Sequence, residues 1–328
     1  MPLVSVLMMF HRVTPFLVPA VRSVLTQTFR DLELVLVDDG CGRGLEPLGE
    51  FGRDPRITLV SRATNGGVAV GHNLAVANAR GEILVKLDFD DIALPERIER
   101  QVAALRENPH LGLVSSRVDA IDLEGRVTGP EFTLPGERDQ YVFSAFTLPG
   151  VNPSYSGRRE IFERCPYRAE FTSAPDYDFF ARALEIAPAR GLPEVLTHYR
   201  HHPQQVTQER ANRMILDACL IRLLTARRRG GRGEDFAGLM AEFASWVRQP
   251  PSLAEAYAQF AVRALREGFA PLAVYHARKL LSARRDPAAW ARATRVLLGA
   301  MRLAPGEAML LCRLFFTGPL KAYRLNPA

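Results

Sequence analysis

Short apolar runs alternate with amphipathic segments through the first third of the chain. Such runs are typical of strands buried on both faces, and apolar residues at helical spacing are typical of helices. Their alternation predicts a mostly parallel sheet with helices on both faces, in which ligands bind beyond the carboxyl ends of the strands. The strand-like runs are "LVSVLMMF" (3–10), "LELVLVDD" (32–39), "RITLVSR" (56–62) and "EILVKLD" (82–88), and the helical segments are 15–27, 70–81 and 95–109.

Acidic residues stand at the ends of two of these runs. Asp38 and Asp39 close one run, and Asp88, Asp90 and Asp91 follow the other within "LDFDD". Carboxylates about 4–6 Å apart raise one another's pKa and destabilise a fold unless a cation compensates. Oxygen ligands suit Mg²⁺ or Mn²⁺, and Mg²⁺ takes its remaining ligands from phosphates. One carboxylate could simply cap the following helix, but a metal–diphosphate site accounts for all three.

The pair Asp38–Asp39 alone is open to two interpretations. It precedes Gly40, and Asp-Gly is a strong turn signal; it could equally accept a hydrogen bond from a ribose or a base edge. The next residues, "GCGRG" (40–44), resemble a dinucleotide-binding loop only superficially. They lack the G-x-G-x-x-G spacing and follow two carboxylates that would repel a pyrophosphate. We therefore place an oxidoreductase last among the candidate enzymes.

The chain changes character near Thr207. Residues 1–207 hold 22 Lys and Arg against 27 Asp and Glu, whereas residues 208–328 hold 20 against 9. A charge shift of this kind marks a boundary. Beyond it the chain has the pattern of helices separated by short breakers such as "RQPPS" and "LAPGE". We expect an α/β domain over residues 1–207 and a basic, all-α accessory domain over residues 208–328.

Four motifs are similar, in order and spacing, to those of family 2 glycosyltransferases. They are "VSVLMMFHR…SVLTQTFRDLELVLVDDG", "NGGVAVGHN…ARGEILVKLDFDD", "PDYDFFARAL" and "YRHH", and the resemblance covers about residues 3–207. It implies a GT-A fold, a nucleotide-diphosphate-sugar donor and a divalent metal ion, Mn²⁺ or Mg²⁺. In most members of this family the anomeric centre is inverted.

The resemblance also implies a donor site. Asp39 matches the carboxylate that holds the uracil imide, Asp90 matches the residue that contacts the ribose, and Asp88 supports them. The family usually has Tyr at the position of His11 and Arg at the position of His72. The implied nucleotide-sugar-binding residues are Met9, Phe10, His11, Asp39, Asn65, His72, Asn73, Asp88 and Asp90.

The metal ligands and the catalytic base come from the same resemblance. Asp91 matches the ligand of the ion that binds both phosphates, and His202 matches the histidine of the family's "Y-R-x-H" motif. Inverting transfer needs a carboxylate that takes the proton of the acceptor hydroxyl, and Asp176 occupies that position. Pro175 stands where the family has Glu. From the residues alone, Asp176 reads as an acid in the first turn of a helix, where the helix dipole would lower its pKa.

The expected function is transfer of a sugar from a nucleotide-diphosphate sugar, with UDP as the expected nucleotide, to a hydroxyl acceptor. The expected acceptor is a glycan or a lipid-linked molecule in the synthesis of cell-surface polysaccharide, lipopolysaccharide or glycolipid. Two alternatives stay open. One is a catalytically degenerate module that binds a sugar nucleotide or a carbohydrate; the other is a nucleotidyltransferase, although "MMFHRVTP" has no Gly-rich basic loop.

The remaining features bear on location and partners. We find no signal-peptide pattern and no run of about 18 uncharged apolar residues, and the four cysteines are scattered as free thiols would be. These features predict a cytoplasmic protein. Basic apolar segments at 220–229 and 308–325 either pack as helices of the accessory domain or lie on the inner face of the membrane. A homo-oligomer is a further option, and nucleic acid is not an expected partner, since the basic residues are dispersed among Leu and Ala.

Overall fold

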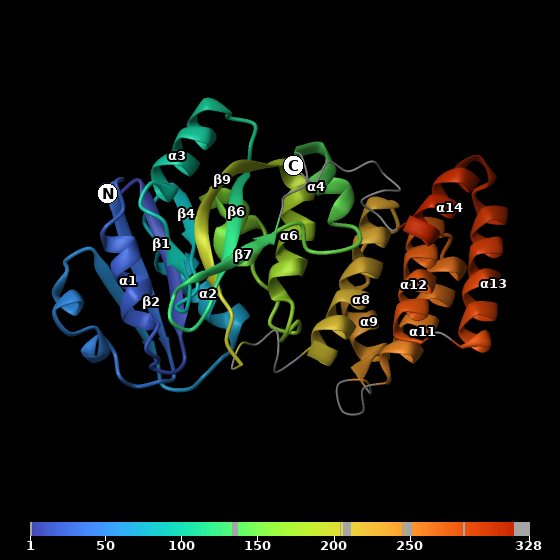
Figure 1. The fold of residues 1–328 in the computed structure, drawn as a ribbon, viewed down its shortest axis with the longest axis horizontal. Coiled ribbons are helices and arrows are strands. Elements are labelled where there is room, and N and C mark those ends of the chain that lie inside the picture. The colour runs from blue at the N-terminus through green and yellow to red at the C-terminus, as the bar shows by residue number, and fades with distance from the viewer. Residues whose placement is uncertain are drawn as a thin grey trace. The chain divides into compact units, whose positions relative to one another are not determined.

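The computed structural model describes residues 2–132, 137–203, 205, 211–244, 246, 251–284 and 286–317, and these residues form two compact units (Figure 1). Unit 1 is built from residues 1–140 and 148–205. Unit 2 is built from residues 141–147 and 206–327. The short stretch 141–147 therefore belongs with the C-terminal helices, although it lies inside the α/β part of the sequence.

The first four strands of unit 1 form a parallel array. They are β1 (Val4–Phe10), β2 (Leu32–Asp39), β3 (Ile57–Arg62) and β4 (Ile83–Lys86), in the spatial order β3-β2-β1-β4. Every neighbouring pair among them is parallel. The prediction of a parallel sheet is confirmed for this half.

The second half of the sheet is mixed. Beyond β4 the order is β8-β6-β9-β5, and β7 pairs with β6 at the side of this path. Of these pairs only β6 with β9 is parallel; β4 with β8, β8 with β6, β6 with β7 and β9 with β5 are antiparallel. The strands are β5 (Ile92–Ala93), β6 (Leu113–Ile121), β7 (Val127–Phe132), β8 (Ser156–Arg158) and β9 (Ala189–Arg200).

Helices cover both faces of the sheet. One apolar cluster joins the sheet to α1 and α3, and another joins it to α2, α5 and α6. Strand β1 shows why the run is continuously apolar: Met8 and Phe10 belong to the first cluster, whereas Leu7 and Met9 belong to the second. The helices are α1 (Leu17–Leu25), α2 (Val68–Asn78), α3 (Arg97–Glu107), α5 (Arg159–Arg164) and α6 (Pro175–Ile186).

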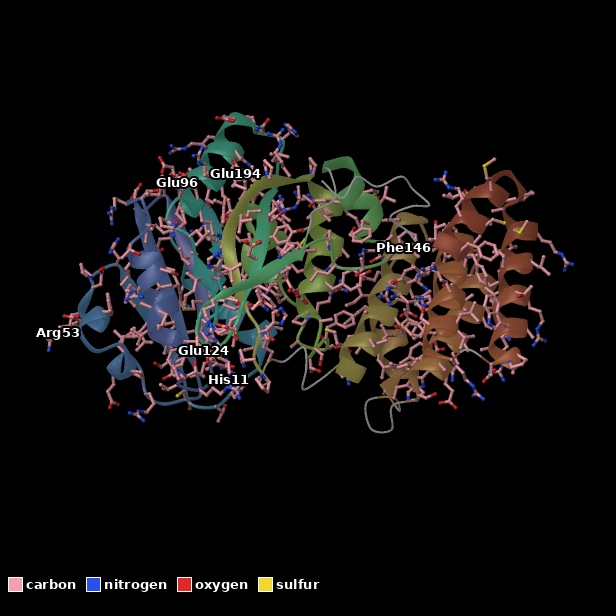
Figure 2. The ribbon with its side chains drawn as sticks, viewed as in Figure 1. His11, Arg53, Glu96, Glu124, Phe146 and Glu194 are labelled. Atoms are coloured by element: carbon pink, nitrogen blue, oxygen red, sulfur yellow. The ribbon has the colours of Figure 1, made fainter. Side chains whose placement is uncertain are left out.

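The carboxyl ends of β1, β2 and β4 meet at one edge of the sheet. In the strand register Phe10 pairs with Asp38, and Leu7 pairs with Lys86. Figure 2 shows His11, the residue after β1, at the lower edge of unit 1 in this view. The acidic residues that follow β2 and β4 therefore gather at the edge where the sequence predicts a ligand.

Unit 2 is helical in its described parts, as the breaker pattern predicts. Its helices are α8 (Ala211–Arg229), α9 (Phe236–Glu242), α11 (Leu253–Arg266), α12 (Ala270–Ala283), α13 (Pro287–Leu303) and α14 (Ala308–Thr317), and α4 (Glu137–Phe143) runs into its first stretch. Within the described ranges, no helix is both long and apolar enough to cross a membrane.

The basic segment at 220–229 packs inside unit 2. Arg222 donates to the carbonyl of Phe146 (2.6 Å), and Arg227 forms an ion pair with Glu267 (2.7 Å). Leu220 and Leu224 of the same helix are buried. This segment is therefore a core helix, which was one of the two expectations. Of the segment 308–325, residues 318–325 lie outside the described residues.

Candidate active site

Asp38 organises the loop after β2. Its Oδ1 accepts hydrogen bonds from the backbone N–H groups of Cys41 (2.8 Å) and Gly42 (3.2 Å), and its Oδ2 accepts from those of Arg43 (3.0 Å) and Gly44 (2.8 Å). The N–H groups of "GCGRG" thus point at a carboxylate within the chain. A pyrophosphate could not use them in this conformation, which agrees with setting the oxidoreductase interpretation aside.

Asp39 holds the loop that leads into α2. Its carboxylate accepts from the backbone N–H groups of Gly66 and Gly67, both at 3.0 Å, and pairs with the Arg62 guanidinium (2.9 Å). Asn65, which is exposed, accepts from the N–H of Gly67 (2.8 Å) and forms the turn. Asp39, at the end of β2, and Asn65 were both predicted to bind the nucleotide sugar, and both hold this loop. In this conformation the carboxylate of Asp39 is bonded to protein donors.

Residues Met9, Phe10 and His11 differ in what they present to the strand end. Phe10 is fully buried in the core, so its side chain is not exposed in this conformation. The side chain of Met9 packs against Gly71, where an added Cβ would lie 2.6 Å from the Met9 sulfur. His11 is partly exposed, and its ring meets the Phe89 ring edge-on at 6.1 Å. Of the three side chains, His11 is the accessible one.

A buried lysine is the first functional residue that the sequence reasoning missed. Lys86, the last residue of β4, is fully buried; its Nζ lies 2.8 Å from Nδ1 of His72 and 3.7 Å from Oδ1 of Asp88. Burial lowers the pKa of Lys86 to about 8, so the amine stays protonated at pH 7. Burial and the nearby ammonium lower the pKa of His72 well below 6.5. His72 is therefore neutral and buried in this conformation, and its role toward the nucleotide stays a prediction.

Asn73 has a structural role. Its Nδ2 donates to the carbonyl of Tyr167 (2.7 Å), and its Oδ1 accepts from the N–H of Tyr167 (2.8 Å). The Tyr167 ring in turn stacks on Phe179 of α6, with 4.8 Å between ring centroids. The amide of Asn73 thus ties α2 to the segment before α6, and its contact with the donor stays a prediction.

Asp176 lies in the first turn of α6, with Pro175 at the first helical position. Proline is favourable there because its φ is already helical and the N–H it lacks would have no helical partner; the change from the family's Glu is compatible with the helix. Burial raises the pKa of Asp176 to about 6, and the charge of Asp88 adds to this. The hydrogen bond from the Tyr177 N–H (2.9 Å) and the charge of Lys86 oppose it.

The raised pKa corrects the expectation that the helix dipole lowers it. Asp176 is partly exposed, but the protein around its carboxyl group removes enough water for desolvation to outweigh the dipole. A carboxylate with a pKa near neutrality is a stronger base than an ordinary aspartate and is still ionised at pH 7. Asp176 therefore has the protonation behaviour that proton abstraction needs.

Asp91 is a buried carboxylate with one oxygen unused. Its Oδ1 accepts from the backbone N–H of Arg200 at the end of β9 (2.8 Å). Among the described residues, its buried Oδ2 has no hydrogen-bond partner. Burial and the neighbouring Asp90 and Asp88 raise the pKa of Asp91 well above its ordinary value. An orphaned, desolvated carboxylate oxygen of this kind fits a position that receives a cation.

Asp90 and His202 face each other across the same strand end. Oδ2 of Asp90 lies 2.9 Å from Nε2 of His202, and the His202 ring packs on Phe16 with 5.3 Å between centroids. The guanidinium of Arg200 lies over the same Phe16 ring, 4.7 Å from its centroid, and donates to the carbonyl of Asp90 (2.9 Å). The "YRHH" segment thus docks on the "DFDD" turn, over a hundred residues away in sequence.

Arg97, at the start of α3, supplies a second buried cation. It is fully buried, and its Nη2 donates to the carbonyl of Lys86 (2.6 Å). Burial lowers the pKa of Arg97 to about 9, and the charges of Asp91 and Asp88 oppose this. At pH 7 the guanidinium is charged, so it partly offsets the cluster of carboxylates. Arg97 stands among other charged residues in "PERIER", so nothing in the sequence marks its guanidinium as buried.

A preformed cage of protein ligands is not present in the part of the chain described: no three His, Cys, Asp or Glu side chains are grouped to hold an ion. An ion at Asp91 would therefore take most of its ligands from the substrate, which is usual for Mg²⁺ bound with a diphosphate. His202 is already engaged with Asp90 in this conformation.

Comparison with known proteins agrees with this arrangement. Residues 5–165 match the model of glycosyl transferase family 2. An uncharacterized glycosyltransferase of Methanocaldococcus jannaschii is 31% identical over 190 residues, 56% of this chain and 65% of that protein. The O-antigen biosynthesis glycosyltransferase WbnJ of Escherichia coli is 27% identical over 207 residues, 61% of this chain and 80% of that protein. The N-terminal half of the chain, residues 5–165, belongs to glycosyltransferase family 2.

The solved structures show the fold. S. aureus TarS 1–349, in a complex with UDP-GlcNAc, superposes with a TM-score of 0.58 at 17% identity, over 98% of this chain and 89% of that chain. The GT-A fold with a helical C-terminal region is thereby confirmed. The match spans 65% of the Methanocaldococcus jannaschii protein and 80% of WbnJ, so this chain covers only part of the length of the curated relatives that it matches.

Proposed function

We propose that this protein is a metal-dependent, inverting glycosyltransferase that uses a nucleotide-diphosphate sugar, with UDP as the nucleotide. The observation that carries the proposal is the acidic turn after β4, where the buried Oδ2 of Asp91 has no hydrogen-bond partner among the described residues. The charge of Asp88 in the same turn helps to raise the pKa of Asp176 at the start of α6, which supports a base close to the proposed donor site.

The chemistry of inverting transfer assigns a role to each of the site residues. The carboxylate of Asp176 takes the proton of the acceptor hydroxyl as that oxygen bonds to C1 of the sugar, and the bond from C1 to the diphosphate breaks on the opposite face. Asp39 and Asn65 shape the loop beside the nucleotide, and Asp90 faces the ribose. Asp91, with His202 nearby, would hold Mn²⁺ or Mg²⁺, which when bound neutralises the charge of the departing diphosphate.

Three findings support the choice of donor and product class. TarS has been solved with UDP and with UDP-GlcNAc. WbnJ is named for O-antigen biosynthesis, and chondroitin synthase of Escherichia coli is 26% identical over 196 residues, 59% of this chain and 28% of that protein. A glycan or lipid-linked acceptor in cell-surface polysaccharide, lipopolysaccharide or glycolipid synthesis is consistent with these relatives. The boundary near Thr207 would then separate catalysis from an accessory domain.

Donor screening is the direct test. With Mn²⁺ present, UDP-sugars are expected to raise the melting temperature of the protein, whereas CDP- and ADP-sugars are expected to have little effect, because cytosine and adenine lack the imide N–H that the Asp39 carboxylate would accept. Thermal-shift measurements, followed by calorimetry on any hit, give the result. If no nucleotide sugar binds with either Mn²⁺ or Mg²⁺, the proposal fails.

The two alternative functions, a binding module and a nucleotidyltransferase, can be distinguished by the product that is released. A binding module would bind the donor but would neither transfer the sugar nor hydrolyse it, and a nucleotidyltransferase would release pyrophosphate from a nucleoside triphosphate. The proposed enzyme releases UDP only when an acceptor, or slowly water, attacks C1. Measuring released UDP and pyrophosphate side by side therefore distinguishes the three.

We further propose that the protein works at the cytoplasmic face of a membrane, through α13 and α14. These helices expose Met309 (77%) and Phe316 (67%), with Trp290, Leu298 and Leu303 also exposed. They also carry several arginines. Exposed apolar side chains among basic residues suit an anionic lipid surface, and the free cysteines agree with a reducing compartment.

Vesicle binding tests this surface. The triple variant Trp290→Ser, Met309→Ser, Phe316→Ser is expected to bind anionic phospholipid vesicles about tenfold or more weakly than the wild type, because it loses most of the exposed apolar area. Cosedimentation at low salt measures it. The matched control is Leu123→Ser, Val127→Ser, which removes exposed apolar side chains from unit 1. Equal binding by all three proteins, or no binding by the wild type, contradicts the proposal.

A further inference from the structure

The helices α11, α12 and α13 enclose a groove to which the proposed function assigns no role. Helix α12 contacts both of the others, and α11 approaches α13 at Gly299, where an added Cβ would lie 2.9 Å from Cδ2 of Leu265. Beside this contact lies a cavity of about 620 Å³, and sites for small molecules measure roughly 300–1,000 Å³. All of its lining residues belong to unit 2. Unit 2 therefore has a concave site of its own, large enough for a small molecule.

The floor of the groove is apolar. Ala261 of α11, Leu280 of α12 and Val296 of α13 line it and are buried. Ala258 is partly exposed and Val262 is exposed, and both lie on α11. The small alanine side chains leave room between the helices. Because apolar surface that stays in contact with water is unfavourable, this floor favours a ligand with an apolar part.

Arginines line the groove on both sides. Two lie on α11 and two on α13, and Glu242 at the end of α9 is the one carboxylate among the described lining residues. The arginines are Arg263, Arg266, Arg292 and Arg295. Within each pair the residues are three apart, so they are neighbours on one helix face and repel each other. An anion in the groove would relieve this repulsion.

The arginines differ in their partners. Arg263 donates to Glu242 (2.7 Å) and to Glu267, so its charge is balanced and its side chain is held in place. Arg266 and Arg292 are exposed, and within the described ranges their side chains form no ion pair and no hydrogen bond. Two guanidinium groups at the groove thus keep all their donors for a ligand.

The chain segments next to these helices do not supply the missing anion. Residues 245–250, between α9 and α11, and residues 318–328, after α14, contain Arg248, Lys321 and Arg324 but no Asp or Glu. Either segment would bring positive charge to positive charge. Trp290, which is proposed to contact a bilayer, lies two residues before Arg292, and residues two apart do not share a helix face. The groove is therefore a different surface from the proposed bilayer contact.

We propose that this groove binds one lipid phosphate, with the hydrocarbon chain on the apolar floor and the phosphate at Arg266 and Arg292. A planar guanidinium group donates two parallel hydrogen bonds to a phosphate, which an ammonium group cannot do. A phospholipid of the bilayer and the phosphate of a lipid-linked molecule share this chemistry. The site needs neither a sugar nucleotide nor a metal ion, so its test is independent of the proposed function.

Calorimetry with octyl phosphate, kept below its critical micelle concentration, tests the site on the whole protein. The wild type is expected to bind it at least about tenfold more tightly than inorganic phosphate, which lacks the chain, or octanol, which lacks the charge. Arg266→Met combined with Arg292→Met should weaken binding about tenfold or more, because hydrogen bonds to a charged group are lost. Ala258→Phe, which fills the floor, should weaken the binding of octyl phosphate alone and leave that of inorganic phosphate unchanged.

The matched control removes two arginines that do not line the groove. Arg278→Met combined with Arg302→Met takes the same charge from α12 and α13 and should bind octyl phosphate like the wild type. The variant with Trp290, Met309 and Phe316 replaced by Ser should also bind it, since the bilayer contact is a separate surface. Circular dichroism checks that each variant is folded. If one groove variant does not fold, the other decides.

A two-chain lipid identifies the source of the ligand. Tighter binding of dihexanoylphosphatidylglycerol than of octyl phosphate, lost in the arginine variant, assigns the groove to a bilayer phospholipid; the reverse order assigns it to a single-chain lipid phosphate. Three results overturn the inference: no binding of octyl phosphate by the wild type, equal binding by the wild type and the arginine variant, or inorganic phosphate bound as tightly as octyl phosphate. A sedimentation coefficient that falls in the arginine variant would show a contact between two copies and would also overturn it.

Discussion

Replacing Asp176 by Asn is expected to lower kcat for sugar transfer by about 10³-fold, because a positioned general base contributes about 10²- to 10⁴-fold. Donor affinity should change less than about twofold, since Asp176 is assigned to the acceptor and not to the nucleotide. Asn keeps the size of the side chain and removes a carboxylate whose burial is unfavourable, so the fold should be retained. Steady-state kinetics and calorimetry on the same protein measure both quantities.

The pH dependence of kcat in the wild type also tests the assignment of Asp176 as the base. The pKa of Asp176 is raised to about 6, so the base is lost by protonation as the pH falls through that value, and kcat should fall with it. The matched variant is Asp178→Asn, two residues along α6. Asp178 is fully buried and pairs with Arg182 at 2.7 Å, so its loss should lower the melting temperature and leave the pH midpoint in place. Near-normal turnover in Asp176→Asn would remove Asp176 as the base.

Replacing Asp91 by Ala is expected to abolish metal-dependent donor binding, with an affinity loss of at least about 100-fold. The physical reason is the buried Oδ2 of Asp91, which has no hydrogen-bond partner among the described residues and is therefore available to a cation. An alanine leaves the diphosphate without a protein-held ion, and its negative charge then faces Asp88 and Asp90. Calorimetry of UDP-sugar binding with and without Mn²⁺ measures the loss.

The control for Asp91→Ala is a carboxylate remote from the strand ends. Glu50 is exposed, and Glu50→Ala should bind the donor with wild-type affinity and the same dependence on Mn²⁺. Circular dichroism should show the same secondary structure in both variants. Wild-type donor affinity in Asp91→Ala, or donor binding that never depended on a metal, would remove the ion from the proposed mechanism.

The elements that could be predicted were those with a strong periodic pattern. Strands β1 to β4 and helices α1 to α3 follow from apolar runs and helical spacing, because each buries one or two whole faces. The mixed half of the sheet could not be predicted from the sequence. Strand β8 (Ser156–Arg158) has three residues and β5 has two, too few to show any period. Their direction depends on partners far away in the chain.

The site residues, too, could be predicted from the sequence only in part. Asp39, Asp91 and Asp176 could be singled out because carboxylates after a buried strand or at a helix start have a chemical signature. Lys86 and Arg97 were missed, because nothing in their sequence neighbourhood says that their charges are buried. The burial of Phe10 and His72 and the hydrogen bonds of Asn73 could not be predicted for the same reason. Their neighbours in space, and not in sequence, decide whether a side chain is exposed.

The sequence by itself determined the class of this protein. Apolar periodicity, acidic strand ends and motif order depend on local residues and on spacing, and they suffice for the family, the parallel half of the sheet and the edge where the site lies. Only the tertiary structure decided the electrostatics of that edge. Desolvation and charge–charge interactions depend on distances across elements, so the raised pKa of Asp176, the orphaned oxygen of Asp91 and the pairing of Lys86 with His72 appear only once β4, α2 and α6 have come together.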